Sequence, residues 1–263
     1  MVSSVNNSLY IKRSKEDAWK GYMLSTLASG AIMSGLLYAG IPFEKQLTKE
    51  YQNNNVYKDA LYKAIKPEYS GIPANTIEIV PAQIKFPNTP EAIGKNAYYS
   101  SKFNQIVLNT EKTTIAGFHE LGHAMNNLKS FIPKYLQRFR HTGYVIAGLM
   151  EYFAIFSRTK PKGEKRNFTD FIEDNCGKIA FLALLPTVIE EAIASIKGIN
   201  IAKKVGIGGS ALKSMKALYT KAFMTYLARA SLTGLAVGAS RIIMDYYTRP
   251  KKISVNNYFT ENS

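Results

Sequence analysis

The sequence predicts a mainly α-helical fold with a small β-sheet and several membrane-associated helices. Three observations lead to this prediction: long apolar segments that carry few or no charges, two short runs typical of strands, and an apolar segment of helical periodicity that follows the second run. A chain of 263 residues can bury an ordinary core without covalent staples. Its single cysteine, Cys176, excludes an intramolecular disulfide and is expected to pack as a small hydrophobic residue.

The first apolar segment, residues 21–43, contains no charged side chain. Its 23 positions would cross a bilayer core of about 30 Å as a helix. Small residues at helical spacing, such as Gly30 with Ser34, would let another helix approach closely. We therefore expect residues 1–43 to form an N-terminal tail and a transmembrane helix. A cleaved signal peptide and a buried core helix are the alternatives.

The next region, residues 44–112, is polar, near-neutral and rich in proline, which is typical of a water-exposed segment. TIEIV at 76–80 and NQIVLN at 104–109 predict two short strands. Residues 113–128 then take helical periodicity, with Thr110 or Thr113 as the N-cap. A strand thus leads directly into a helix.

Three later apolar segments, 143–156, 179–196 and 222–244, each contain ionisable side chains. A charge near the middle of a bilayer costs about 2.5–3.5 kcal/mol even on permissive insertion scales. These segments are either short membrane or interfacial helices, or buried helices of a globular domain resting on the membrane. We expect a C-terminal apolar helical region at 205–248, and a disordered tail at 249–263.

The net charge of +15 is concentrated in the second half of the chain. Residues 129–263 hold 21 basic and 9 acidic side chains, against 13 and 10 in residues 1–128. The basic residues form short clusters between apolar segments, a spacing typical of membrane-flanking loops that meet anionic lipid. We expect membrane lipid as a partner, the bacterial inner membrane as the location, and no nucleic acid.

The segment TTIAGFHELGHAMNNL places two of the three histidines four residues apart. On a helix, His119 and His123 lie on one face and can direct both imidazoles at one point. This geometry suits a Zn2+ ion, and Glu120 is placed to take a proton from a water beside the metal. The pattern is the HExxH arrangement of zinc hydrolases, so we expect a zinc site with Glu120 as its catalytic residue.

A catalytic zinc site requires a third protein ligand. Glu190 and Glu191 lie in an otherwise apolar segment, where two carboxylates without a partner would be costly. We favour Glu191 as the ligand and keep Glu190 as an alternative. His141, the one remaining histidine, is a second alternative, although its basic surroundings are more typical of a loop or an interface.

HELGHA, followed 68 residues after His123 by EAIAS, resembles the gluzincins, and within them the membrane-bound CAAX-prenyl-protease and HtpX-like family. The upstream KNAYYSSKFNQIVLN is similar to a segment of that family. The resemblance implies a zincin-like catalytic core at 44–204, with His119, His123 and Glu191 on zinc and Glu120 as general base. It also implies that strand 104–109 is an edge strand that binds the substrate backbone.

The chain departs from the family pattern at Ser195, where the family usually has an aspartate after ExxA. Arg229 and Arg241 are the candidates for stabilising the oxyanion. The expected function is a membrane-associated zinc endopeptidase acting on a peptide or protein substrate. The alternative is a non-catalytic, basic, membrane-anchored protein with a structural or degenerate zinc site.

Overall fold

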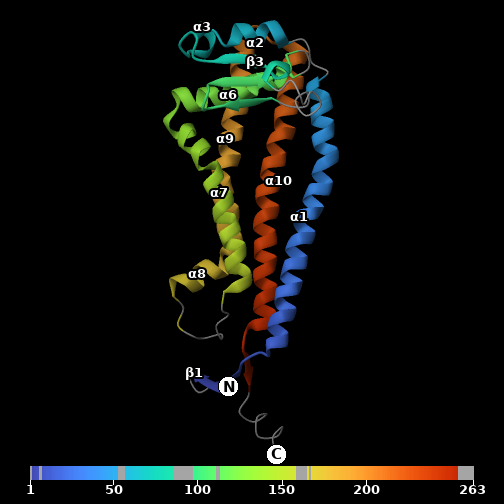
Figure 1. Ribbon diagram of the computed structural model, residues 1–263, viewed down its shortest axis with the longest axis vertical. Coiled ribbons are helices and arrows are strands. Elements are labelled where there is room, and N and C mark those ends of the chain that lie inside the picture. Colours follow the sequence, from blue (N-terminus) through green and yellow to red (C-terminus); the bar gives the residue numbers. More distant parts are fainter. Residues whose placement is uncertain are drawn as a thin grey trace, which may run out of the picture. The chain divides into compact units, whose positions relative to one another are not determined.

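The computed structural model describes residues 2–5, 8–52, 57–85, 97–110, 113–157, 165 and 167–253 (Figure 1). These residues are mostly helical and form two small three-stranded sheets. The prediction of a mainly α fold with a small β component is confirmed.

The chain folds into two compact units, each assembled from separated parts of the sequence. Unit 1 comprises Met1–Leu37, Thr142–Leu184 and Arg229–Ser263, and unit 2 comprises Tyr38–His141 and Leu185–Ala228. The boundaries of these units differ from those of the four consecutive segments expected from the sequence, because the long helices have residues in both units. Each unit is described separately below.

Four long helices contribute to both units. They are α1 (Lys15–Gln52), α7 (Phe131–Phe156), α9 (Cys176–Lys204) and α10 (Gly209–Thr248). Unit 2 adds the short helices α2 (Lys58–Ala64), α3 (Pro67–Ser70) and α4 (Ala82–Lys85), the strands β3 (Glu78–Pro81), β4 (Tyr98–Ser100) and β5 (Gln105–Leu108), and helix α6 (Thr114–Lys129).

The sheet of unit 2 has the strand order β3-β5-β4. β3 runs parallel to β5, with Ile79 opposite Ile106, and β4 runs antiparallel to β5, with Tyr99 opposite the same residue. The two predicted strands are therefore present. The expectation that 104–109 is an edge strand is wrong, because β5 pairs on both sides. Among the described residues, β4 lies at an edge of the sheet.

Helix α6 packs on this sheet and forms the centre of the core of unit 2. Ile115, Phe118 and Leu121 of α6 are fully buried, as are Ile106 and Leu108 of β5. The helical spacing of the first three and the alternation of the last two match the periods of a helix and a strand. The motif helix is thus held rigidly by buried apolar contacts.

Unit 1 contains the short helix α8 (Phe168–Asp174) and the sheet β1-β2-β6, formed by Val2–Val5, Ser8–Ile11 and Lys251–Ile253. β6 pairs with β2, Leu9 lying opposite Ile253. The start of the expected disordered tail is therefore ordered, because this pairing satisfies its backbone. The remainder of that tail, from residue 254, lies outside the described residues.

Three helical ranges are long and apolar enough to span a membrane: Lys15–Glu50, Cys176–Lys204 and Gly209–Thr248. They contain the predicted segments 21–43, 179–196 and 222–244. The fourth segment, 143–156, lies in α7, which is not among the three ranges. Only 7% of the apolar window of α1 is buried within the protein. An apolar helix with so little protein cover is typical of a surface that faces lipid.

Candidate metal centre

The motif helix α6 follows β5 after a short turn that Thr113 fixes. Thr113 occupies the N-cap position, one of the two expected from the sequence. Its hydroxyl donates to the Asn109 carbonyl at 3.1 Å and accepts from the Asn109 amide at 3.0 Å. The side chain therefore closes the turn and makes no capping bond to the helix.

Two glycines bring α6 and α9 into backbone contact. A Cβ atom at Gly122 of α6 would overlap the Ala194 carbonyl oxygen of α9. A Cβ atom at Gly198 of α9 would overlap the Phe118 carbonyl oxygen of α6. Side chains of ordinary size would separate helices by about 8–10 Å, so the close approach depends on these small residues. It places the carboxylates of α9 against the histidines of α6.

Three potential ligand atoms meet at this crossing. The Nε2 atoms of His119 and His123 lie 3.0 Å apart. Glu191 Oε2 lies 3.0 Å from the first and 3.5 Å from the second. All three side chains are largely shielded from solvent.

The other imidazole nitrogens bind different partners. Nδ1 of His123 lies 2.8 Å from Glu190 Oε1, which also accepts from Asn126 Nδ2 at 2.8 Å. Nδ1 of His119 lies 3.1 Å from the Ser195 hydroxyl. Because a carboxylate only accepts, His123 donates to Glu190 from Nδ1, and its Nε2 atom faces His119 and Glu191.

The adjacent glutamates therefore have different positions. Glu191 faces the two Nε2 atoms, whereas Glu190 faces the far side of His123. Neighbouring residues on a helix point about 100° apart. One atom each of His123, Glu190 and Glu191 nevertheless lie within 4.8 Å of one another, and Glu191 is the glutamate that approaches both Nε2 atoms. This geometry favours Glu191 as the third ligand and gives Glu190 an orienting role.

Glu120 lies beside the triad and is 8% exposed. Its carboxylate and the ring nitrogens of His119 and His123 lie within 4.8 Å of one another. The position is close enough for it to share a water with a group held by the histidines.

Arg140 of α7 is a member of the cluster that the sequence analysis did not identify. Its guanidinium forms an ion pair with Glu191 Oε1, and its Nη2 lies 3.7 Å from Glu190 Oε2. Glu191 thus presents one oxygen to the histidines and the other to Arg140. In the sequence, Arg140 lies in the basic run RFRHTG, where no spacing distinguishes it from its basic neighbours.

The cluster gathers three carboxylates around one guanidinium, that of Arg140. Burial, reinforced by the neighbouring His123, lowers the pKa of the His119 imidazole to about 4, so this ring is neutral at neutral pH. A divalent cation would pair with the carboxylates of Glu120, Glu190 and Glu191 at this position.

The donor set and its spacing fit a zinc ion. Tetrahedral zinc with bonds of about 2.0–2.1 Å separates neighbouring ligand atoms by about 3.3–3.4 Å. The three separations of 3.0, 3.0 and 3.5 Å lie close to this value. Three lone-pair-bearing atoms at such distances repel one another unless protons or a cation lie among them. Two nitrogens and one carboxylate oxygen match the His2Glu set of catalytic zinc.

Three other candidates from the sequence are not members of this cluster. His141 is solvent-exposed on α7. Arg229 and Arg241 belong to unit 1, where Arg241 pairs with Glu173 and Asp245 at 3.4 and 3.2 Å. Within unit 2, the arginine at the carboxylates is Arg140.

Comparison with known proteins gives no relative. No protein-family model, no curated protein and no solved structure matches the chain.

Proposed function

We propose that the protein is a membrane-associated zinc endopeptidase. The observation that carries the proposal is the convergence of His119 Nε2, His123 Nε2 and Glu191 Oε2, with the Glu120 carboxylate beside them. When bound, zinc would supply the Lewis acidity that polarises a scissile carbonyl and acidifies a water. A zincin-like core of the gluzincin type, as the sequence resemblance implies, is part of the same proposal.

The residues of the cluster divide the work of such a site. Glu120 takes a proton from the attacking water and passes it to the leaving amine. Glu190 accepts a hydrogen bond from His123 Nδ1 and fixes the orientation of that ring, and Ser195 does the same for His119. Arg140, on the outer oxygen of Glu191, keeps this carboxylate in one orientation.

The substrate backbone would pair with β4, which lies at an edge of the sheet. It takes the role that was expected of strand 104–109. β4 is linked to the motif helix, because Asn127 of α6 donates to the Tyr99 hydroxyl at 3.1 Å. A peptide added to this edge would be held at a fixed position relative to α6. The three apolar helical ranges would keep the enzyme at the membrane.

Metal content tests the site. We would purify the protein in detergent without chelators, add zinc back, and measure bound metal in the wild type, His123→Ala, Glu191→Ala and His141→Ala. We expect about one zinc per chain in the wild type and in the exposed-histidine control, and loss of zinc in the other two variants. Absence of zinc from the wild type would refute the proposal.

Hydrolysis tests the chemistry. Glu120→Gln should keep its zinc and lose about 10²- to 10⁴-fold in the rate of cleavage of an unfolded reporter protein such as casein. Wild-type cleavage in this variant would remove Glu120 from the mechanism.

The pairing of Arg140 with Glu191 favours a second candidate function, a non-catalytic protein in which this cluster is a structural or degenerate site. A guanidinium at the carboxylates stabilises them in part without a metal. The distinguishing measurement is water exchange at a cobalt-substituted site: an exchangeable water indicates an open, catalytic position, and a closed ligand shell indicates a structural one.

A further inference from the structure

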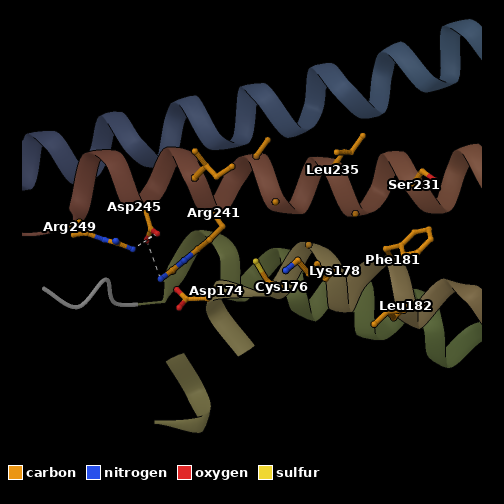
Figure 2. A pocket seen from close by; sticks show the side chains of 15 residues that line it. Asp174, Cys176, Lys178, Phe181, Leu182, Ser231, Leu235, Arg241, Asp245 and Arg249 are labelled. Atoms are coloured by element: carbon orange, nitrogen blue, oxygen red, sulfur yellow. Dashed lines mark hydrogen bonds and ion pairs between the residues drawn. The ribbon is translucent and has the colours of Figure 1, made fainter. Parts of the chain in front are cut away.

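A pocket of about 1050 Å³ lies in unit 1, whereas the histidine cluster belongs to unit 2 (Figure 2). Its walls are the N-terminal part of α9 and the C-terminal part of α10. This volume is at the upper end of the roughly 300–1,000 Å³ that is typical of small-molecule sites.

The pocket is amphiphilic along its length. Figure 2 shows Arg241, Asp245 and Arg249 gathered at one end, and Phe181 with Leu235 at the other. Large apolar side chains that line the pocket are exposed in this protein, among them Leu182, Leu235 and Ile242 at 57, 62 and 72%. An exposed apolar surface joined to a charged end is the shape that an amphiphile would fill.

The glycines of the pocket bring α9 and α10 into backbone contact. Gly177 of α9 packs against Gly234 and Gly238 of α10, and a Cβ atom at Gly177 would lie 2.7 Å from the Gly234 carbonyl oxygen. The helices therefore touch through their backbones at this level. Side chains on either side of the contact form the walls.

The charged end contains hydrogen-bond donors that the protein does not satisfy. The Nε atoms of Arg241 and Arg249 are buried and have no hydrogen-bond partner among the described residues. Arg241 is 6% exposed, although its Nη atoms bind Ser157, Glu173 and Asp245. Unpaired guanidinium N–H groups in a pocket require an acceptor, and an anionic oxygen is the strongest one.

The position of the pocket along the helices matches one leaflet of a bilayer. The candidate span of α9 begins at Cys176 and that of α10 ends at Thr248, so the charged end lies at the termini of both spans. From Arg249 to Leu235, α10 rises about 21 Å at 1.5 Å per residue. Half of a bilayer of about 40–45 Å, headgroups included, is about the same length.

We infer that this pocket binds one anionic phospholipid, with the phosphate at Arg241 and Arg249 and an acyl chain along Phe181 and Leu235. Lys178 also lines the pocket, so the lining holds three cationic groups against the carboxylates of Asp174 and Asp245. A second copy of the chain could cover the apolar wall, but it would leave the two buried Nε donors without an anion. A phosphate offers several acceptor oxygens to donors from two helices.

The test is lipid binding by native mass spectrometry of delipidated protein in detergent. We would titrate the wild type with phosphatidylglycerol and with phosphatidylcholine of the same acyl chains. We expect binding of one phosphatidylglycerol at about tenfold lower concentration than phosphatidylcholine, because both lipids offer a phosphate, but the choline cation of the second offsets the attraction of that phosphate to the arginines. Equal binding of both lipids, or a protein dimer in place of bound lipid, would overturn the inference.

Two pairs of variants locate the lipid. Arg249→Gln should reduce the preference for phosphatidylglycerol by about tenfold, whereas Lys20→Gln, which removes an exposed charge outside the pocket, should keep it. Leu235→Trp should weaken both lipids by filling the groove, whereas Leu24→Trp, on α1, should weaken neither. Circular dichroism and size exclusion verify that each variant is folded. A preference that survives Arg249→Gln would place the lipid elsewhere.

Discussion

Each unit contains a cluster of arginine and carboxylate side chains. The two clusters differ in how their hydrogen-bond donors, acceptors and potential metal ligands are arranged. In unit 1, the guanidinium of Arg241 donates to carboxylates and a hydroxyl: Glu173, Asp245 and Ser157. In unit 2, two imidazole nitrogens and one carboxylate oxygen face one another at 3.0 to 3.5 Å. The first cluster pairs one guanidinium with its acceptors, whereas the second places three atoms that can each bind a metal within 3.5 Å of one another.

The comparison shows that buried charge alone does not identify a metal site. Arg241 is about as deeply buried as the candidate ligands of unit 2, yet the oxygen atoms around it are already paired with its guanidinium. Convergence of lone pairs is the property that a cation would stabilise. Four substitutions test this distinction, in order of decreasing effect.

Removing the arginine of unit 1 should affect stability and leave zinc binding intact. Arg241→Met removes the buried guanidinium that pairs with Glu173 and Asp245, which we expect to lower the free energy of unfolding in detergent by about 3–5 kcal/mol. Arg138→Met, at an exposed position of α7, should change it by about 0.5 kcal/mol or less. Denaturant titration measures the change, and a loss of zinc in folded Arg241→Met would contradict the separation of the two clusters.

Separating α6 from α9 should remove the metal site. Gly122→Ala places a methyl group against the Ala194 carbonyl, so we expect about 1–3 kcal/mol of destabilisation together with loss of zinc. The matched control is Gly148→Ala on α7, where no atom lies within 4 Å of the added Cβ. Alanine there should stabilise the helix by up to about 1 kcal/mol. Full zinc occupancy in Gly122→Ala would show that the close backbone contact is not required.

Glu190 should affect the metal through His123. Glu190→Gln keeps an acceptor for His123 Nδ1 but removes the negative charge, so zinc affinity should fall by about 10- to 100-fold. Glu173→Gln alters an equally buried glutamate of unit 1 and should leave the affinity unchanged. Competition with a chromogenic chelator measures both, and complete loss of zinc in Glu190→Gln would make Glu190 itself a ligand.

The smallest effect is expected at Ser195. Ser195→Ala removes the hydroxyl partner of His119 Nδ1, and zinc affinity should fall by about 2- to 10-fold, the value of one neutral hydrogen bond. Ser195→Asp should raise the affinity above that of the wild type, because a carboxylate makes the imidazole a stronger donor to the metal. Competition with the chromogenic chelator measures the zinc affinity of both variants. Weaker binding in Ser195→Asp would show that the site excludes a further negative charge.

Local sequence patterns predicted the parts of the structure that depend on neighbouring residues. The strands β3 and β5, the motif helix and the shared face of His119 and His123 follow from periods of two and of 3.6 residues. The three long apolar helices follow from composition. Their extents of 38, 29 and 40 residues exceed the apolar segments, because polar flanks continue each helix beyond its apolar part.

Pairing between distant segments was not predictable in the same way. The central position of β5 depends on two partners that no local pattern specifies, so the edge was assigned to the wrong strand. The roles of Glu190 and Glu191 depend on how α9 is rotated against α6, which the contact at Gly122 determines. Arg140 joins the cluster only through the packing of a third helix. These features depend on contacts between residues far apart in the sequence. No fixed spacing in a single sequence indicates such contacts.

The ligands of the cluster come from helices that the ribosome completes at different times. Glu191 is synthesised 68 residues after His123, an interval of about 3–14 s at 5–20 residues per second. Part of unit 1, Thr142–Leu184, is made in between. The nascent chain therefore holds the histidine pair without its carboxylate while another part of the protein is produced, and a complete three-ligand site can form only after α9 has emerged. The proposed zinc site is therefore completed only at a late stage of biosynthesis.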